Sequence, residues 1–200
     1  MLDIFSMVLG IYGANCYIVM EKSSGTGFII DPGADGEEVI EKLNANNIRP
    51  EFILLTHGHI DHVGAVDSLV QEFNIPVYIA EEDMKAIEAH IEIFGEIKSE
   101  VKFINEQTKI KVGNCEVQVI ETPGHTKGGL CFLVDGVLFT GDTLFRESIG
   151  RTDFYGGNYE EILSSIEEKL FTLEEKIVVL PGHGPKSTIA FEKSNNPFLN

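Results

Sequence analysis

The placement of the histidines constrains this chain most, because each group of them follows a short apolar run. Five of the six histidines fall into three segments, THGHIDH at 56–62, TPGHT at 122–126 and PGHG at 181–184. The runs before them, FILL, VQVIE and IVVL, have the composition of strands. A fourth segment, LFTGDT at 138–143, has the same form with a carboxylate. Since layered folds usually build their sites on loops at strand ends, these four loops are the candidates for a functional site.

The rest of the pattern predicts sheets covered by helices. Short β-branched or aromatic runs predict strands at 3–8, 16–20, 27–30, 52–55, 77–79, 116–120, 130–134, 137–139 and 177–180. Helical spacing predicts helices at 37–46, 63–73, 81–94 and 159–170, the last with Asn158 as its N-cap. This mixture favours an α/β or α+β layered domain. Because no linker, repeat or charge block interrupts the chain, we expect residues 1–200 to form one domain.

The charge balance narrows the range of partners. Fifteen Lys and Arg stand against 32 Asp and Glu, which gives a formal net charge of -17. Such a surface repels phosphate backbones and anionic lipids, so we expect neither nucleic acid nor membrane partners. No apolar stretch approaches the length of a spanning helix, and the N-terminal residues lack the basic region of a signal peptide. Three widely spaced cysteines suit free thiols, so we expect a cytoplasmic protein, with its oligomeric state left open.

The polar residues of the four segments predict a metal site. Neutral imidazole and carboxylate are ligands for Zn, Fe(II) or Mn(II), and seven such groups exceed the needs of one four-coordinate ion. Two metals are therefore expected. The spacing of THGHIDH does not fit one helix face, where neighbours come three or four residues apart, so it requires an extended or turning loop. The predicted ligands are His57, His59, Asp61, His62, His125, Asp142 and His183.

A turning loop can direct His57 and His59 to one ion while Asp61 and His62 face a second. His125 would then complete the first position, His183 the second, and the two oxygens of Asp142 could bridge both. The predicted groups are His57, His59 and His125 for the first ion and Asp61, His62 and His183 for the second. Taken singly, the residues outside THGHIDH could instead belong to ordinary turns, because Gly and Pro surround them.

The four segments resemble the metal motifs of the metallo-β-lactamase superfamily, with THGHIDH as the first motif and His125, Asp142 and His183 as the later ones. The resemblance covers nearly the whole chain. It implies a four-layer αββα sandwich with a binuclear site between the two sheets. Asp142 stands where the zinc-dependent lactamases usually have a cysteine, which disfavours antibiotic hydrolysis.

Two longer stretches, GDTLFRESIGRTDF at 141–154 and PGHGPKSTIAFEKSNNPFL near the C-terminus, resemble small bacterial glyoxalase II-type hydrolases. The resemblance implies hydrolysis of S-D-lactoylglutathione or a related 2-hydroxyacyl thioester with two divalent ions, zinc first and iron or manganese as alternatives. A hydroxide bridging the ions would attack the thioester carbonyl, with Asp61 and Asp142 as catalytic residues. Arg151 falls where these enzymes have a cation that meets glutathione, and Tyr155 is expected to line the pocket.

Two departures leave the substrate thiol open. The chain ends 17 residues after His183, without the C-terminal helical domain of larger glyoxalase II enzymes, and Gly184 replaces an aromatic residue of those enzymes. Persulfide dioxygenases of the same superfamily also resemble this sequence, through GRTDF at 150–154. They hold one iron through residues that match His57, His125 and Asp142, so a mononuclear iron dioxygenase is the alternative function.

Overall fold

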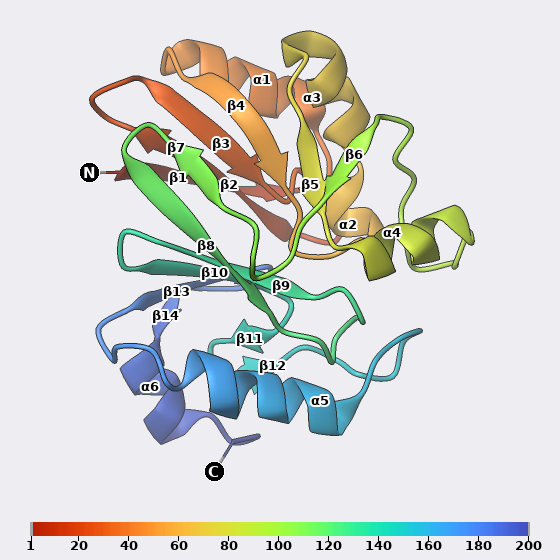
Figure 1. Ribbon diagram of the computed structural model, residues 1–200, viewed down its shortest axis with the longest axis vertical. Coiled ribbons are helices and arrows are strands. Elements are labelled where there is room, and N and C mark those ends of the chain that lie inside the picture. The colour runs from red at the N-terminus through yellow and green to blue at the C-terminus, as the bar shows by residue number, and fades with distance from the viewer. Residues whose placement is uncertain (1, 200) are drawn as a thin grey trace.

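The computed structural model describes residues 2–199, in which two β-sheets pack face to face between two groups of helices (Figure 1). Helices α1 (Gly36–Ala45) and α3 (Val66–Phe73) cover the outer face of one sheet. Helices α5 (Tyr159–Ser164) and α6 (Ile189–Asn195) cover the outer face of the other, with the π-helical turn η1 (Ser165–Leu170) continuing α5. This arrangement confirms the predicted αββα sandwich.

The first sheet has the strand order β1-β2-β3-β4-β5-β6. Its strands are β1 (Leu2–Leu9), β2 (Ala14–Glu21), β3 (Thr26–Ile30), β4 (Arg49–Leu54), β5 (Val77–Ile79) and β6 (Val101–Phe103). The first three pair antiparallel and the last four pair parallel. Parallel pairs need crossover connections, which α1, α3 and α4 (Glu81–Glu88) supply. The carboxyl ends of β3 and β4 therefore open at the same edge, where the short helix α2 (Ile60–Val63) begins.

The second sheet has the order β14-β13-β10-β9-β8-β7. Its strands are β7 (Ile110–Val112), β8 (Cys115–Glu121), β9 (Leu130–Val134), β10 (Val137–Gly141), β13 (Val178–Pro181) and β14 (Ser187–Thr188). Among the described strand pairs of this sheet, only β10 and β13 run parallel, so the carboxyl ends of these two strands lie side by side. A two-stranded ribbon, β11 (Leu144–Phe145) and β12 (Ser148–Ile149), follows β10 directly.

Alternation along the strands divides the core into three layers. On β2, Cys16 and Ile18 pack toward the helices of the first sheet, whereas Tyr17 and Val19 pack toward the second sheet. A third cluster lies between the second sheet and the helices α5, η1 and α6. The central strands β2, β3 and β9 are thus covered on both faces, which explains why they appear in the sequence as nearly continuous apolar runs.

All nine predicted strands are present, and Asn158 caps α5 by accepting hydrogen bonds from the N–H groups of Glu160 and Glu161. The prediction of a helix over 81–94 is wrong at its C-terminal end. It stops at Glu88, because the chain turns at Ala89 and His90 adopts a left-handed φ of 54°. The pattern does not predict α6 or the short strands β6, β7, β11, β12 and β14, because such short segments show no clear periodicity.

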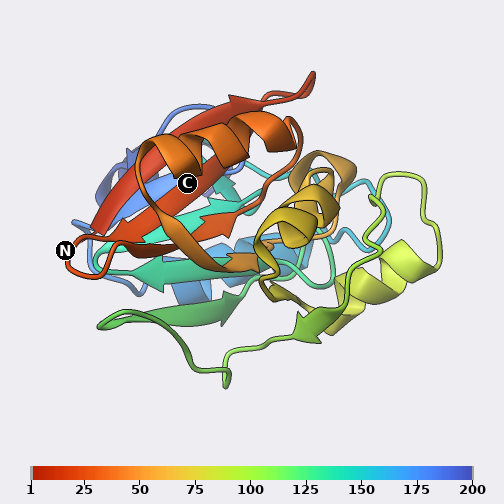
Figure 2. The ribbon, with the colours of Figure 1, turned by 90° about the horizontal axis from the view of Figure 1, so that it is seen from above.

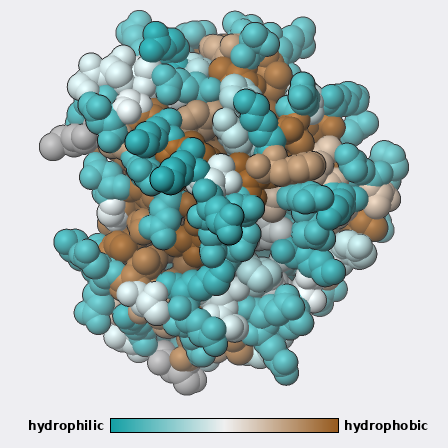
Figure 3. All heavy atoms as spheres, viewed as in Figure 1, coloured by the Kyte–Doolittle hydropathy of each residue, from teal (hydrophilic) through white to brown (hydrophobic). Residues whose placement is uncertain are grey.

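The surface of the molecule is mixed in hydropathy. On the face shown in Figure 3, hydrophilic residues cover much of the surface, and hydrophobic residues show in patches between them. From above, α1 and α3 lie side by side over the first sheet (Figure 2). None of the helices between residues 2 and 199 has both the length and the apolar character that a membrane crossing needs.

The packing between the sheets predicts a large loss of stability on truncation of Phe132. This side chain on β9 is fully buried in the layer between the sheets. Phe132→Ala should lower the free energy of unfolding by about 3–5 kcal/mol, measured by chemical denaturation. Phe103→Ala on β6 is the control, because Phe103 is 54% exposed and should cost much less. Equal losses in the two variants would contradict the layered core.

Candidate metal centre

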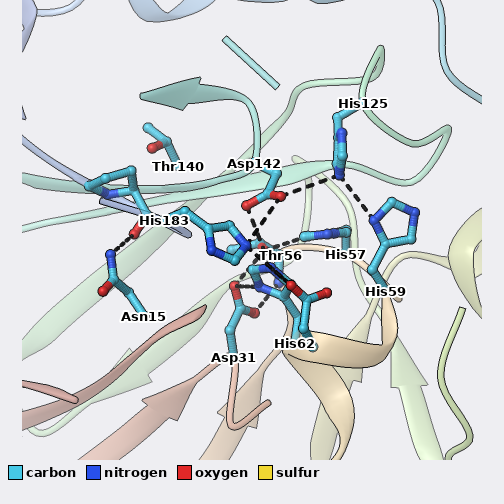
Figure 4. A network of polar contacts seen from close by, with 12 residues as sticks. Asn15, Asp31, Thr56, His57, His59, His62, His125, Thr140, Asp142 and His183 are labelled. Carbon is cyan, nitrogen blue, oxygen red and sulfur yellow. Dashed lines mark hydrogen bonds and ion pairs between the residues drawn. The ribbon is translucent and has the colours of Figure 1, made fainter. Parts of the chain in front are cut away.

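All seven predicted ligands lie together at the edge where strands of both sheets end (Figure 4). His57 and His59 follow β4 in an extended loop, and Asp61 and His62 stand in the first turn of α2. The second sheet contributes the remaining three, one each from the loops after β8, β10 and β13: His125, Asp142 and His183. The cluster thus lies across the boundary between the sheets, and neither sheet supplies it alone.

The ligand atoms form three groups, and the atoms of each group lie within 4.8 Å of one another. Two of the groups correspond to the predicted division, His57 with His59 and His125, and Asp61 with His62 and His183. The third group, Asp31 with His57 and His62, overlaps both. Asp142 lies between the two predicted groups. Its Oδ2 is 3.5 Å from His125 Nε2 and 3.7 Å from His183 Nε2, and its Oδ1 is 3.5 Å from His62 Nε2. One carboxylate therefore faces both groups.

The outer nitrogens of three rings are hydrogen-bonded, which orients the inner ones. His125 Nδ1 donates to the carbonyl of Arg151 at 2.7 Å, and His62 Nδ1 donates to Asp31 Oδ2 at 3.0 Å. The Thr56 hydroxyl donates to Asp31 Oδ2 at 2.6 Å, so it is free to accept from His57 Nδ1 at 3.1 Å. Because each Nδ1 holds its proton outward, each Nε2 points inward and can offer a lone pair when its ring is neutral. Hydrogen bonds to the outer nitrogen orient metal-binding histidines in this way generally.

The inner atoms fit a divalent cation. Among the described residues, four buried side-chain atoms have no hydrogen-bond partner, and all four belong to this cluster: His57 Nε2, His59 Nε2, His62 Nε2 and Asp142 Oδ1. Leaving such atoms unpaired in the interior is costly, whereas a cation satisfies lone pairs and a carboxylate together. The donor set of imidazole and carboxylate is one that Zn, Fe(II) and Mn(II) accept.

Electrostatics keeps the first group in the form that binds metal. Burial, and then the neighbouring rings, holds the pKa of His57 well below its ordinary value. Burial and the neighbouring His125 lower the pKa of His59 to about 3. Both imidazoles are therefore neutral at pH 7, which leaves their lone pairs available. Burial also acts to lower the pKa of His62, but the carboxylates of Asp142 and Asp31 outweigh it and raise the value to about 9.

Asp31, which is not among the predicted site residues, supports this cluster through hydrogen bonds. Asp31 follows β3, is buried, and accepts from the Thr56 N–H at 2.8 Å as well as from the Thr56 hydroxyl and His62. Its φ of 50° marks a sharp bend of the chain. A signal was present, because Asp31 directly follows the apolar run GFII, as the histidine segments follow theirs.

The β1–β2 hairpin holds the last ligand loop. Asn15 Nδ2 donates to the carbonyls of Pro181 at 2.9 Å and Gly184 at 3.0 Å, on either side of His183. The hydroxyl of Tyr17 donates to the same Pro181 carbonyl at 2.7 Å. A strand of the first sheet thus fixes a ligand loop of the second.

A cavity of about 460 Å³ opens onto the cluster. Arg151 lines it, with its guanidinium 3.7 Å from the ring centre of Phe154 and paired with both oxygens of Asp153 at 2.7 Å. Tyr155 does not line this cavity. It lies in a neighbouring hollow, with its ring 6.3 Å from that of Phe94, so that Phe154 occupies the wall where Tyr155 is expected.

Comparison with known proteins identifies the family. The model of the metallo-beta-lactamase superfamily matches residues 9–183, and the chain therefore belongs to this superfamily. A curated relative, hydroxyacylglutathione hydrolase GloC of Haemophilus influenzae, is 36% identical over 93% of this chain and 92% of its own length.

Solved structures agree with this assignment. BLEG-1, described as a B3 metallo-beta-lactamase, is 34% identical with a TM-score of 0.91, covering 98% of this chain and 99% of its own. TTHA1623 in a di-iron-bound form is 32% identical with a TM-score of 0.87, covering 98% and 100%. ETHE1 from Myxococcus xanthus is 26% identical with a TM-score of 0.82, covering 98% and 83%.

Because Asp142 lies between the two groups, we expect removal of its carboxylate to weaken metal binding. Zn²⁺ should raise the melting temperature of the metal-free wild-type chain, and Asp142→Ala should reduce this rise. A 100-fold weaker affinity removes up to about 2.7 kcal/mol of the stabilisation. Differential scanning fluorimetry across a Zn²⁺ titration measures it. Asp3→Ala, which removes a carboxylate paired with Lys22, is the control, and an equal response in the two variants would contradict the shared role.

Proposed function

We propose that this protein is a metal-dependent thioester hydrolase of the glyoxalase II type, which cleaves S-D-lactoylglutathione or a related 2-hydroxyacyl thioester. The observation that carries the proposal is the two groups of ligand atoms that share Asp142 at the base of a cavity. The similarity to GloC over more than nine-tenths of both chains supports the substrate class.

In this proposal His57, His59 and His125 would hold one divalent ion, Asp61, His62 and His183 would hold another, and Asp142 would be available to both. Such ions supply Lewis acidity, which lowers the pKa of water and polarises a carbonyl oxygen. Zinc is the first choice, with iron or manganese as alternatives.

Asp61 is proposed to orient the attacking water. Burial acts to raise the pKa of Asp61, but the hydrogen bond with His183 and the neighbouring His62 outweigh it and bring the value to about 2. The carboxylate is therefore ionised at neutral pH, and it lines the cavity, where it can accept a hydrogen bond from water. The leaving thiol needs no strong acid, because a thiol has a pKa of about 8.5 and departs as the thiolate.

Arg151 is proposed to bind a carboxylate of the substrate. Among the described residues that line the cavity it is the only Lys or Arg. Its stacking on Phe154 and its pairing with Asp153 hold the guanidinium in place at the cavity wall. Asp153 competes for the same charge, so the substrate must displace this carboxylate or share the guanidinium with it.

The cellular setting is also a proposal. The cysteines Cys16, Cys115 and Cys131 are free, and two of them are buried. Free buried thiols suit a reducing compartment, so we propose a cytoplasmic enzyme that acts on a small molecule. The net charge of -17 speaks against nucleic acid or anionic membranes as partners.

The hydrolase and dioxygenase functions are separated by one paired assay. Protein loaded separately with Zn, Fe(II) or Mn(II) is given S-D-lactoylglutathione, and the same samples are given glutathione persulfide while oxygen uptake is followed. We expect thioester cleavage without oxygen uptake. Oxygen uptake confined to the iron sample would instead support the dioxygenase that GRTDF at 150–154 also resembles. A β-lactam serves as a third substrate, and its cleavage in place of the thioester would contradict the proposal.

Removal of the Arg151 side chain should affect binding more than turnover. Arg151→Ala is expected to raise KM by about tenfold or less, because the charge-assisted bond it loses is partly exposed, and to leave kcat nearly unchanged. Arg146→Ala is the matched control, since this guanidinium stacks on Phe191 outside the cavity. Steady-state kinetics would contradict the assignment if both variants behaved alike or if kcat carried the whole loss.

A further inference from the structure

Asp83 is a buried carboxylate outside the ligand cluster. It lies in the first turn of α4 and is 1% exposed. Three donors surround it. Its Oδ2 accepts from the Gly58 N–H and from the Thr126 hydroxyl, each at 2.9 Å, and its Oδ1 accepts from the Gly128 N–H at 2.7 Å. No Lys or Arg of the described chain forms an ion pair with it, so these hydrogen bonds must offset the cost of burying the charge.

The donors to Asp83 are sequence neighbours of the first ligand group. Gly58 separates His57 from His59, and Thr126 directly follows His125. The first two histidines belong to the loop after β4 of the first sheet, whereas His125 belongs to the loop after β8 of the second. A single carboxylate therefore joins the two loops whose separation decides whether these three rings can contact one ion.

The close approach of both loops requires glycine at the two backbone donors. A Cβ added at Gly128 would lie 2.6 Å from Asp83 Oδ1, and one at Gly58 would lie 2.9 Å from Cδ1 of Phe94. A side chain at Gly128 would collide with the carboxylate itself, and one at Gly58 would collide with the ring of Phe94 beside the loop. Asp31 has a different place in the cluster. It contacts His62 of the second group directly and reaches His57 of the first through Thr56, but it does not contact Gly58, Thr126 or Gly128.

We propose that Asp83 is a positioning residue that fixes the spacing between the His57–His59 loop and His125, and thereby sets the affinity of the first metal position. It touches neither the cavity nor the ligand atoms, so it acts only through the loops it joins. The inference rests on the metal centre of the proposed function and is independent of its substrate.

The test is Asp83→Asn in two backgrounds that each keep one ligand group. An asparagine offers one acceptor oxygen, so in either orientation the N–H of Gly58 or of Gly128 faces an NH₂ group and loses its partner. In the His183→Ala chain, which keeps the first group, Zn²⁺ affinity should fall by about 10- to 100-fold. In the His125→Ala chain, which keeps the second group, it should change by no more than about twofold. Competition with a chromogenic chelator measures both.

Two further variants separate positioning from a general loss of stability. Glu192→Gln alters another fully buried carboxylate, which belongs to α6 and lies away from the cluster. The Glu192 carboxylate accepts a hydrogen bond from the Glu147 N–H at 2.9 Å. This variant should lower the melting temperature without changing Zn²⁺ affinity. Thr126→Val removes only the hydroxyl donor to Asp83, so it should fold normally and weaken the first group by less than Asp83→Asn does.

Three results would overturn the inference. One is equal weakening of both ligand groups by Asp83→Asn, another is the same affinity loss in Glu192→Gln, and the third is unchanged affinity in both Asp83→Asn and Thr126→Val. A wild-type chain that binds no Zn²⁺ would overturn the metal centre together with this inference. Normal Zn²⁺ binding without thioester cleavage would contradict only the proposed function.

Discussion

The central constraint on this structure is that it buries the ligand atoms of several histidines and one aspartate without hydrogen-bond partners. Three histidine nitrogens and one carboxylate oxygen are buried without a hydrogen-bond partner. The other nitrogens of the same three rings are hydrogen-bonded to Thr56, Asp31 and His125. Protein interiors rarely tolerate such atoms, because each costs a large part of its hydration free energy. The cost is met when a cation is bound, so the cluster is better explained by metal binding than by packing.

The αββα sandwich makes this gathering possible. Parallel strands in each sheet end at the same edge, and the face-to-face packing of the sheets brings those two edges together. Side chains away from the ligands then set the fine spacing. Asp31 holds Thr56 and His62, Asn15 holds the loop around His183, and Asp83 joins the loops of the first group. The layers place the loops, and these buried polar contacts orient them.

The sequence predicted the layers and the ligand cluster because both leave strong local signals. Long apolar runs mark central strands, and histidines after such runs are rare enough to stand out. The supports were not predictable in the same way. Asp83 lies in an ordinary amphipathic helix, and its role arises only because α4 packs against two loops distant in sequence. Tyr155 shows the same limit of prediction from sequence. The conformation of the 150–155 loop decides which of two adjacent aromatic residues lines the cavity, and it is Phe154 and not Tyr155.

The most direct test of this account is anomalous diffraction at the zinc edge from crystals of the Zn²⁺-loaded protein. The account predicts two peaks, roughly 3.5–4 Å apart as in other two-metal sites. One should lie among His57, His59 and His125, the other among Asp61, His62 and His183, with Asp142 contacting both. A cluster without any peak would contradict the metal centre, and a single peak shared by His57, His125 and Asp142 would contradict the two-metal arrangement.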